Sequence, residues 1–278
     1  MKNILITGAG SYIGQSFAQY IAAHCSEKYR VSTVDTIGND WKNTDFSQYD
    51  CVFHVAGIAH RKETAENAPL YYTVNRDLAV QIAQAAKAAG VKQFVFLSSM
   101  SVYGLETGHI TRATQPAPKS HYGKSKLEAE QLLAPLADDS FILTVLRPPM
   151  VYGKDCKGNF QSVIKLVKKL PFFPKINNRR SMLYIENLCA YVVFCIENQL
   201  GGLHLPQNPE YMNTSEMAGY IAKGLGKKLR PSRLLGFGVW LLLPFLKPAQ
   251  KAFGSLTYEQ ENIPLTLVCS EESVTVSV

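Results

Sequence analysis

Three residues of types used in proton transfer are spaced so that they could act together. Tyr122 and Lys126 are four residues apart, which puts two side chains on one face of a helix. Ser99 closely follows the apolar run Phe94 to Leu97. A phenol with a pKa of about 10 is a poor base at neutral pH, but a neighbouring ammonium favours its phenolate. Tyr122 could then exchange a hydroxyl proton, with Lys126 lowering its pKa and Ser99 hydrogen-bonding the reacting oxygen.

This spacing predicts a site only in its context, because the numbers of Tyr and Lys residues make one such pair expected by chance. The elements that must position the pair alternate along the first half of the chain. Strands are predicted at 3–6, 31–34, 51–55, 94–97 and 141–146, and helices at 16–23, 75–89 and 124–133. Near-continuous apolar strands that alternate with helices predict an α/β fold, a Rossmann-type doubly wound parallel sheet with helices on both faces.

The alternation ends after Gly153, where Pro, Lys and Asn become frequent. We therefore expect a Rossmann domain at residues 1–152 and a smaller C-terminal substrate domain over most of residues 153–278. One segment near 185–205 is expected to return to the sheet.

A glycine-rich turn, residues 7–14 (Thr-Gly-Ala-Gly-Ser-Tyr-Ile-Gly), follows the first predicted strand and opens the first helix. Small residues let the backbone approach a pyrophosphate, whose charge the helix N-terminus favours. Asp35 ends the second strand, where a carboxylate can accept from ribose hydroxyls and repel a 2′-phosphate; it could also be an ordinary turn acid. The pattern predicts NAD rather than NADP. The proton exchanged by Tyr122 would then accompany hydride transfer between the substrate carbon and nicotinamide.

The composition is that of a soluble globular protein. The chain has 278 residues, of which 46% are hydrophobic and 18% charged, and a formal net charge of +7. These values exclude collagen-like, disordered and disulfide-scaffold classes. The six cysteines show no zinc-ligand spacing, so no metal site is expected and a reduced cytoplasmic compartment is the simplest interpretation. No signal peptide is predicted at Met1–Gly14.

Basic residues gather in the second half. Residues 154–180 hold eight basic residues and one acid, and residues 217–258 hold seven basic residues and no acid. Such a field suits an anionic small molecule, a membrane surface or nucleic acid, or is simply a solvated basic face. Zinc-finger, RRM and basic-zipper patterns are missing from the sequence, so no nucleic-acid partner is predicted.

The longest apolar stretch, Leu234–Leu246, has 13 residues and is too short to span a membrane. A buried helix of the smaller domain is the leading interpretation. An oligomer contact and a peripheral membrane contact are the alternatives, the latter because four basic residues flank the stretch: Arg230, Arg233, Lys247 and Lys251.

These motifs together resemble the extended short-chain dehydrogenase/reductases, in particular the NAD-dependent epimerase/dehydratase group that acts on nucleotide sugars. Gly8 and Gly14 match the family's Thr-Gly-x-x-Gly-x-x-Gly turn, while Ser11 replaces the middle glycine. Residues 54–57 (His-Val-Ala-Gly) are similar to the strand end that lines the cofactor. Asp45-Phe46 is similar to the pair beside the adenine, and Val74-Asn75-Arg76 to a structural asparagine segment. The resemblance implies these cofactor contacts: Gly8, Gly10, Ser11, Tyr12, Ile13, Gly14, Asp35, Asp45, Phe46, Val55, Ala56, Gly57, Asn75, Tyr122, Lys126 and Pro148.

Residues 98–104 are similar to the family's catalytic serine strand, which implies Ser99, Tyr122 and Lys126 as the catalytic set. Dehydratases of the family carry an Asp-Glu pair directly after the hydroxyl residue. Here Met100 and Ser101 occupy those places and cannot supply acid and base for loss of water. The sequence therefore argues against a 4,6-dehydratase.

Substrate contacts are implied downstream. Residues 146–153 are similar to the segment beneath the nicotinamide, and residues 157–160 and 177–181 to nucleotide-diphosphate elements of bacterial UDP-N-acetylhexosamine 4-epimerases and 4-ketoreductases. Ser99, Tyr122, Asn159 and Arg180 are the implied substrate-binding residues, although Asn159 could be a loop cap and Arg180 a surface arginine. His60 could face the sugar or be an ordinary, partly buried histidine.

The resulting hypothesis is a cytoplasmic, NAD-dependent epimerase acting at C4 of a UDP-hexose or UDP-N-acetylhexosamine through a 4-keto intermediate. One alternative is an NAD(P)H-dependent 4-ketoreductase of a UDP-4-keto-6-deoxy-N-acetylhexosamine in surface polysaccharide synthesis. Another is a non-catalytic NAD-binding sensor. The resemblance also implies a homodimer.

Overall fold

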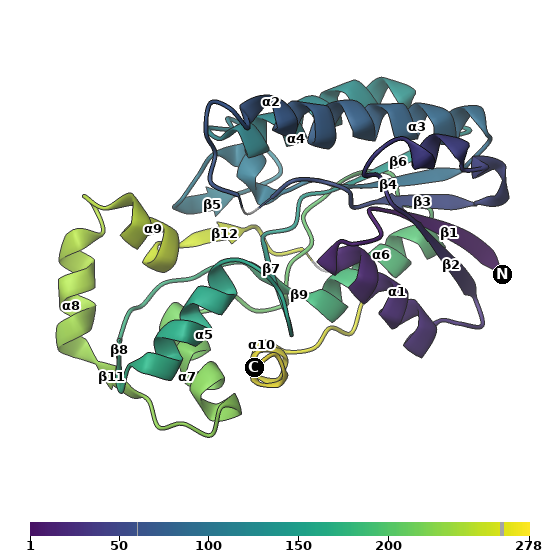
Figure 1. Cartoon of the computed structure of the whole chain (residues 1–278). Coiled ribbons are helices and arrows are strands. Elements are labelled where there is room, and N and C mark those ends of the chain that lie inside the picture. Colours follow the sequence, from purple (N-terminus) through teal and green to yellow (C-terminus); the bar gives the residue numbers. More distant parts are fainter. Residues whose placement is uncertain (60, 262–263) are drawn as a thin grey trace. The chain divides into compact units, whose positions relative to one another are not determined.

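A computed structural model describes residues 1–59, 61–261 and 264–278 (Figure 1). The backbone forms two compact units. The first unit comprises residues 1–104, 116–148 and 189–206, and the second comprises residues 105–115, 149–188 and 207–278. The chain thus leaves the first unit and returns to it after residue 188. The division into domains at residue 152 stays a prediction.

The first unit is built on a six-stranded sheet in which every neighbouring pair is parallel. Its strands are β1 (Lys2–Thr7), β2 (Tyr29–Val34), β3 (Cys51–His54), β4 (Gln93–Leu97), β6 (Ile142–Leu146) and β10 (Gly202–His204). They are ordered β10-β6-β4-β3-β1-β2. This sheet confirms the predicted Rossmann-type α/β fold.

The strand order changes direction beside β1. From β1 the chain crosses to β2 on one side and then to β3 on the other, with Thr7 of β1 in register with His54 of β3. The chain therefore continues from β1 and from β3 to strands on opposite sides of the sheet. Such a switch point, at the carboxyl ends of the strands, is where open α/β sheets bind ligands.

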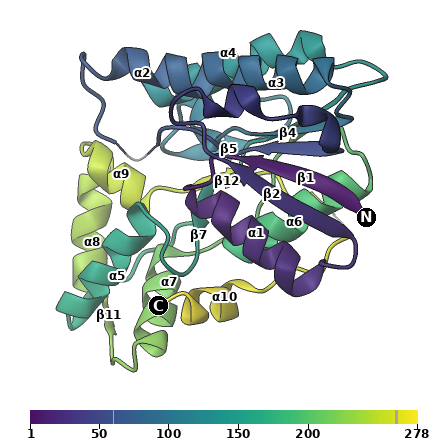
Figure 2. The ribbon, with the colours of Figure 1, turned by 45° about the vertical axis from the view of Figure 1, so that its right-hand side comes forward.

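Helices cover both faces of the sheet, as Figures 1 and 2 show: α2, α3 and α4 lie over one face, and α1 and α6 over the other. Their bounds are α1 Tyr12–His24, α2 Ala68–Tyr72, α3 Leu78–Ala88, α4 His121–Leu133 and α6 Ile185–Glu197, with a π-helical turn at Thr73–Asp77 between α2 and α3. Helix α3 packs into the core through an apolar stripe at helical spacing, Ala79, Ile82, Ala83 and Ala86.

The segment between β2 and β3 forms two short 3₁₀ turns, Asp40–Asn43 and Phe46–Gln48, in place of a further strand. Each turn directs one aromatic side chain into the core: Trp41 and Phe46 are each 5% exposed. The segment is therefore anchored by apolar burial rather than by a strand ladder.

The second unit contains three two-stranded parallel pairs and five helices among its described residues. The pairs are β5 (Gly108–Ile110) with β12 (Leu256–Tyr258), β7 (Met150–Tyr152) with β9 (Met182–Tyr184), and β8 (Phe172–Pro174) with β11 (Arg230–Ser232). The helices are α5 (Asn159–Lys169), α7 (Thr214–Gly224), α8 (Arg233–Leu242), α9 (Lys247–Phe253) and α10 (Ser270–Val276). Helix α7 packs against both α5 and α10.

The apolar stretch 234–246 forms most of α8 and the turn before α9, but it is not a buried helix as the leading interpretation expected. Gly236 is the buried residue of α8, whereas Leu234 is 81% and Phe245 82% exposed. Bulky side chains point outward because the helix rests on its neighbour through a glycine. None of the helices within the described ranges is long and apolar enough to cross a membrane.

Candidate active site

The glycine-rich turn begins where β1 ends. Gly8 has φ +101°, a left-handed conformation that disfavours side chains, and its amide donates to the Val34 carbonyl at 2.9 Å. A Cβ added to Gly8 would lie 2.9 Å from the backbone N and Cα of Ala56, in the loop after β3. The two loops at the switch point thus touch through Gly8, and glycine is required there for both reasons.

Ser11, the departure from the family's glycine pattern, is the N-cap of α1. Its Oγ accepts a hydrogen bond from the Gly14 amide at 3.0 Å. Serine is among the best N-cap residues, so the helix begins at Tyr12 without a middle glycine in the turn. The first turn of an α-helix carries partial positive charge and outward-facing amides, which suits a phosphate.

Two glycine substitutions separate the roles of this turn. We expect Gly8→Ala to lower the free energy of unfolding by about 1 to 3 kcal/mol, because it combines backbone strain with a close contact to Ala56. Gly10→Ala is the matched control: its added Cβ meets no atom of the described residues within 4 Å. We expect it to change stability by less than about 0.5 kcal/mol. Urea titration checks both, and equal losses would contradict this assignment.

The two acids of the predicted cofactor site differ in their surroundings. Asp35 follows β2, is exposed, and accepts the Ile37 amide at 2.9 Å. Asp45 caps the second 3₁₀ turn, accepting from the Ser47 amide at 3.1 Å and the Ser47 hydroxyl at 2.6 Å. These hydrogen bonds favour the carboxylate and hold the Asp45 pKa below its ordinary value. Asp45 therefore stabilises its own turn, while Asp35 stands at the carboxyl edge of the sheet.

Asn75 orders the loop after β3. It is fully buried in the π-helical turn; its Oδ1 accepts from the Ile58 amide at 2.7 Å and its Nδ2 donates to the Ile58 carbonyl at 3.1 Å. Nδ2 also donates to the Ser125 hydroxyl of α4 at 3.1 Å. Asn75 thus ties the loop that holds Val55, Ala56 and Gly57 to the helix of the Tyr-x-x-x-Lys pair.

Ser99 follows β4 and caps a 3₁₀ turn at Met100–Tyr103, where its Oγ accepts the Ser101 amide at 3.1 Å. The same side chain is hydrogen-bonded to that of Tyr122. The segment that follows β6 fixes the backbone of this turn: the Met100 amide donates to the carbonyl of the buried Pro148 at 2.9 Å. The structure therefore brings Ser99 and Tyr122 together.

Helix α4 starts three residues earlier than predicted, because Ser120 caps it through the Gly123 amide at 3.0 Å. Tyr122 lies in its first turn and Lys126 one turn later, on the same face. Burial raises the pKa of Tyr122, and the hydrogen bond with Ser99 lowers it.

Lys126 is 4% exposed, and its Nζ donates to the Leu97 carbonyl at 2.7 Å and lies 4.7 Å from the centre of the Phe96 ring. Burial lowers the pKa of this ammonium to about 8, opposed by the charge of Glu130. His54 is fully buried, with its Nδ1 2.7 Å from the Thr7 hydroxyl. Burial and the Lys126 charge lower its pKa to about 3, so it is neutral near pH 7. Near pH 7, His54 therefore adds no positive charge next to Lys126.

The Lys126 pKa predicts a pH dependence of stability. The folded pKa of about 8 lies below the ordinary 10.5, so the unfolded chain binds more protons between these values and stability rises with pH there. Lys126→Met removes the contribution of this ammonium to the pH dependence of stability. We expect the unfolding free energy of the wild type, relative to Lys126→Met, to rise by on the order of 3 kcal/mol from pH 8 to 10.5. Denaturant titrations of both cofactor-free proteins across this range check it, and a constant difference would contradict it.

Two features of the site were missed by the sequence analysis. Glu63 accepts the amides of His121 at 2.9 Å and Tyr122 at 3.0 Å, so a carboxylate stabilises the start of α4. Glu130 of α4 is buried, accepts from Ser98, and forms an ion pair with the buried Arg147, whose Nε lies 3.0 Å from Oε1. Glu63 acts across 58 residues of sequence, which leaves no local pattern by which to recognise it.

The predicted substrate residues Asn159 and Arg180 belong to the second unit. Asn159 is exposed at the first position of α5, after Gly158 with φ +101°. Arg180 is partly buried and donates from Nη1 to the Gly254 carbonyl at 2.7 Å. Burial lowers its pKa, and the charge of Glu106 opposes this effect. His60 lies outside the described residues.

The chemistry of the donor set fits NAD. Gly8 and Gly14 keep the turn close to the sheet, α1 supplies a helix N-terminus, and Asp35 supplies a carboxylate one strand away. Across residues 1–59, 61–261 and 264–278, no three His, Cys, Asp or Glu side chains are grouped to hold a metal ion.

Comparisons with known proteins agree with this arrangement. Residues 4–205 match the model of the NAD dependent epimerase/dehydratase family. The chain is 32% identical to a UDP-glucose 4-epimerase of Vibrio cholerae, over 86% of this chain and 80% of the relative. It is 26% identical to the N-acetyl-alpha-D-glucosaminyl-diphospho-ditrans,octacis-undecaprenol 4-epimerase of Escherichia coli O157:H7, over 86% and 77%.

Solved structures share the fold. The UDP-glucuronic acid 4-epimerase of Bacillus cereus, crystallised with NAD, superimposes with a TM-score of 0.75 at 22% identity and covers 99% of this chain and 97% of that chain. The chain therefore belongs to the NAD dependent epimerase/dehydratase family and is an NAD-dependent enzyme of the extended short-chain dehydrogenase/reductase type.

Proposed function

We propose that the enzyme inverts C4 of a UDP-linked hexose or N-acetylhexosamine through a 4-keto intermediate. The observation that carries the proposal is the hydrogen bond between Ser99 and Tyr122, with buried Lys126 one turn further along α4. The 4-epimerases among the relatives support the same chemistry.

The catalytic residues act on the C4 oxygen. Bound NAD would supply the hydride acceptor, and later the hydride donor, for C4 of the sugar. Tyr122 takes the C4 hydroxyl proton and later gives it back, while Ser99 hydrogen-bonds the same oxygen and orients it. Burial raises the pKa of Tyr122. In the proposed mechanism the Lys126 ammonium, one turn along α4, favours the phenolate of Tyr122. Rotation of the 4-keto sugar between the two transfers inverts the carbon.

Cofactor binding is proposed at the switch point. The turn at residues 8–14 holds the pyrophosphate, Asp35 holds the adenosine ribose, and Lys126 holds the nicotinamide ribose. Asp45 and Phe46 border the adenine. The loop at Val55–Gly57, ordered by Asn75, and the segment at Pro148 border the remainder. Asp35 favours NAD over its 2′-phosphorylated form because a carboxylate there repels the added phosphate.

Substrate binding is proposed through the second unit, with Arg180 as the fork that pairs with the diphosphate and Asn159 as a hydrogen-bond donor to it. The proposal includes a cytoplasmic homodimer with peripheral contact to the membrane.

The test is incubation of the purified enzyme with UDP-glucose, UDP-N-acetylglucosamine or N-acetylglucosaminyl-diphospho-undecaprenol, without added cofactor, followed by NMR. Formation of a 4-epimer from either UDP-sugar supports the proposal. Epimerisation of the lipid-linked sugar alone would keep the C4 chemistry but contradict the UDP-linked substrate. If all three remain unchanged while a UDP-4-keto-6-deoxy sugar is reduced at the expense of NAD(P)H, the enzyme is a 4-ketoreductase and the epimerase proposal fails. Binding of NAD with no conversion in either assay identifies a sensor.

A further inference from the structure

One solvent-exposed face of the second unit is unusually apolar. Eight large side chains of α8 and the following turn are at least 45% exposed: Leu234, Leu235, Phe237, Trp240, Leu241, Leu242, Phe245 and Leu246. Phe237 and Trp240 are stacked, with ring centroids 5.8 Å apart, and Trp240 is 64% exposed. Contiguous apolar surface of this kind marks an interaction site in a soluble protein. We name it the α8 face.

The contacts between α8 and the segment at Lys175 leave the α8 face exposed to solvent. Lys175 donates its amide to the Ser232 carbonyl at 2.9 Å, and Ser232 caps α8 through the Leu235 amide. A Cβ added to Gly236 would lie 2.1 Å from the Lys175 carbonyl oxygen. The helix therefore rests on residue 175 by direct backbone contact at a glycine, which leaves its bulky residues on the other sides.

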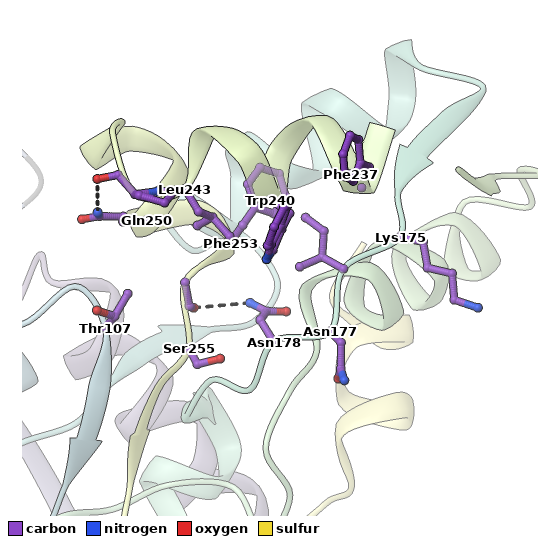
Figure 3. A pocket seen from close by; sticks show the side chains of 14 residues that line it. Thr107, Lys175, Asn177, Asn178, Phe237, Trp240, Leu243, Gln250, Phe253 and Ser255 are labelled. Carbon is purple, nitrogen blue, oxygen red and sulfur yellow. Dashed lines mark hydrogen bonds between the residues drawn. The ribbon is translucent and has the colours of Figure 1, made fainter. Parts of the chain in front are cut away.

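A pocket of about 560 Å³ adjoins the α8 face. Figure 3 shows Trp240 of α8 and Phe253 of α9 near the segment that carries Asn178. Leu243, in the turn after α8, also lines the pocket. The Asn178 amide is already engaged, donating to the Thr214 hydroxyl at 2.8 Å. The aromatic and aliphatic side of the pocket includes Phe237 and Trp240, which also belong to the α8 face, so an acyl chain could enter the pocket from that face.

The rim of the α8 face is basic. Lys175, Arg230, Arg233 and Lys251 are exposed. Residues 217–258 contain no acid; Glu106, which is next to the pocket residue Thr107, interacts with Arg180. Aromatic and aliphatic side chains surrounded by Lys and Arg are the pattern of helices that lie in the interface of an anionic membrane.

We infer that the α8 face docks on an anionic phospholipid bilayer, with Trp240 and Phe245 entering the boundary between headgroups and acyl chains. The inference rests on the peripheral location proposed above and not on the reaction. A second copy of the chain fits less well, because a two-fold contact sets a patch against itself. Each basic rim would then face another basic rim, whereas the bilayer supplies the opposite charge.

The first experiment is sedimentation with vesicles of phosphatidylcholine alone or mixed with phosphatidylglycerol. We expect the full chain to sediment with the anionic vesicles at low salt and to be released by high salt. Trp240→Ser combined with Phe245→Ser should weaken this binding at least about tenfold. Ile37→Ser is the matched control, because Ile37 is 85% exposed in the first unit, and it should bind as the wild type does.

Trp240 also reports its own environment, since the chain has two tryptophans and Trp41 is buried. The emission difference between the wild type and Trp240→Phe should move to shorter wavelength on addition of anionic vesicles. Failure to sediment with anionic vesicles at low salt overturns the inference. So does a dimer that Trp240→Ser dissociates in the absence of lipid, which would assign the face to a second copy.

Turnover of UDP-sugars without vesicles separates this inference from the proposed function. The Trp240 and Phe245 variants should retain it. If the wild-type protein binds vesicles but epimerises no UDP-sugar, the proposed reaction is contradicted while the proposed docking surface is supported.

Discussion

Replacing Tyr122 by Phe is expected to lower turnover by about 100- to 10,000-fold, the usual contribution of a positioned acid–base group. The change deletes one hydroxyl, which is hydrogen-bonded to Ser99, and leaves the ring in place. Lys126 keeps its bond to the Leu97 carbonyl, so we expect NAD binding to change by less than threefold or so. Initial rates on the accepted UDP-sugar and NAD titration by calorimetry measure the two quantities.

Tyr49→Phe is the matched control for that variant. Tyr49 packs at the edge of the apolar core of the first unit, so loss of its hydroxyl also leaves a ring in place. Its turnover should stay within about twofold of the wild type. Substantial turnover by Tyr122→Phe, or equal losses in both variants, would remove Tyr122 from the proposed mechanism.

Glu130→Ala should be the most destabilising single change in α4. Glu130 and Arg147 are 8% and 7% exposed, and Arg147 also donates from Nη1 to the Tyr103 hydroxyl at 2.8 Å. Removing the carboxylate takes the ion-pair partner away from a buried guanidinium and costs about 3 to 5 kcal/mol of unfolding free energy. Because Ser98 also binds Glu130, the strand end beside Ser99 should loosen. Denaturant unfolding at neutral pH measures the stability.

The control is Glu197→Ala, which breaks the exposed pair with Lys28. An exposed pair contributes at most about 1 kcal/mol. The double variant Glu130→Gln with Arg147→Met removes both buried charges, so it should recover part of the stability lost in Glu130→Ala. If Glu130→Ala lowers the unfolding free energy by less than about 1 kcal/mol, water reaches the Glu130–Arg147 pair and the prediction is wrong.

Much of the first unit could be predicted because its signals are local. Apolar runs such as Phe94 to Leu97 are strands, and the fold class, the family, the enzyme class and NAD are confirmed. Helix boundaries were less accurate where side-chain capping set them: Ser120 starts α4 before the run of strong helix formers. The segment between β2 and β3 forms no strand, and the burial of Trp41 and Phe46 anchors it instead.

The assigned roles of the site residues stay predictions, although the structure brings Ser99 and Tyr122 together. Glu63 and the Glu130–Arg147 pair escaped notice because tertiary contacts create them. Hydropathy failed at residues 234–246 for a different reason. Apolar composition predicts burial, but Gly236 lets α8 approach its neighbour so closely that the large side chains remain outside. Composition alone does not show which side of α8 contacts the rest of the second unit.

The return of the chain to the first unit has a consequence for its synthesis. Strand β10 pairs with β6, and the carbonyl of Leu200, just before β10, accepts from the Thr144 hydroxyl at 2.6 Å, yet residues 149–188 of the second unit are made in between. A nascent chain that has reached residue 148 therefore presents β6 as an unpaired edge, open to association with other strands. The Rossmann sheet gains its last strand only once residue 204 has emerged from the ribosome. The N-terminal half therefore cannot complete its fold first, as contiguous domains usually do.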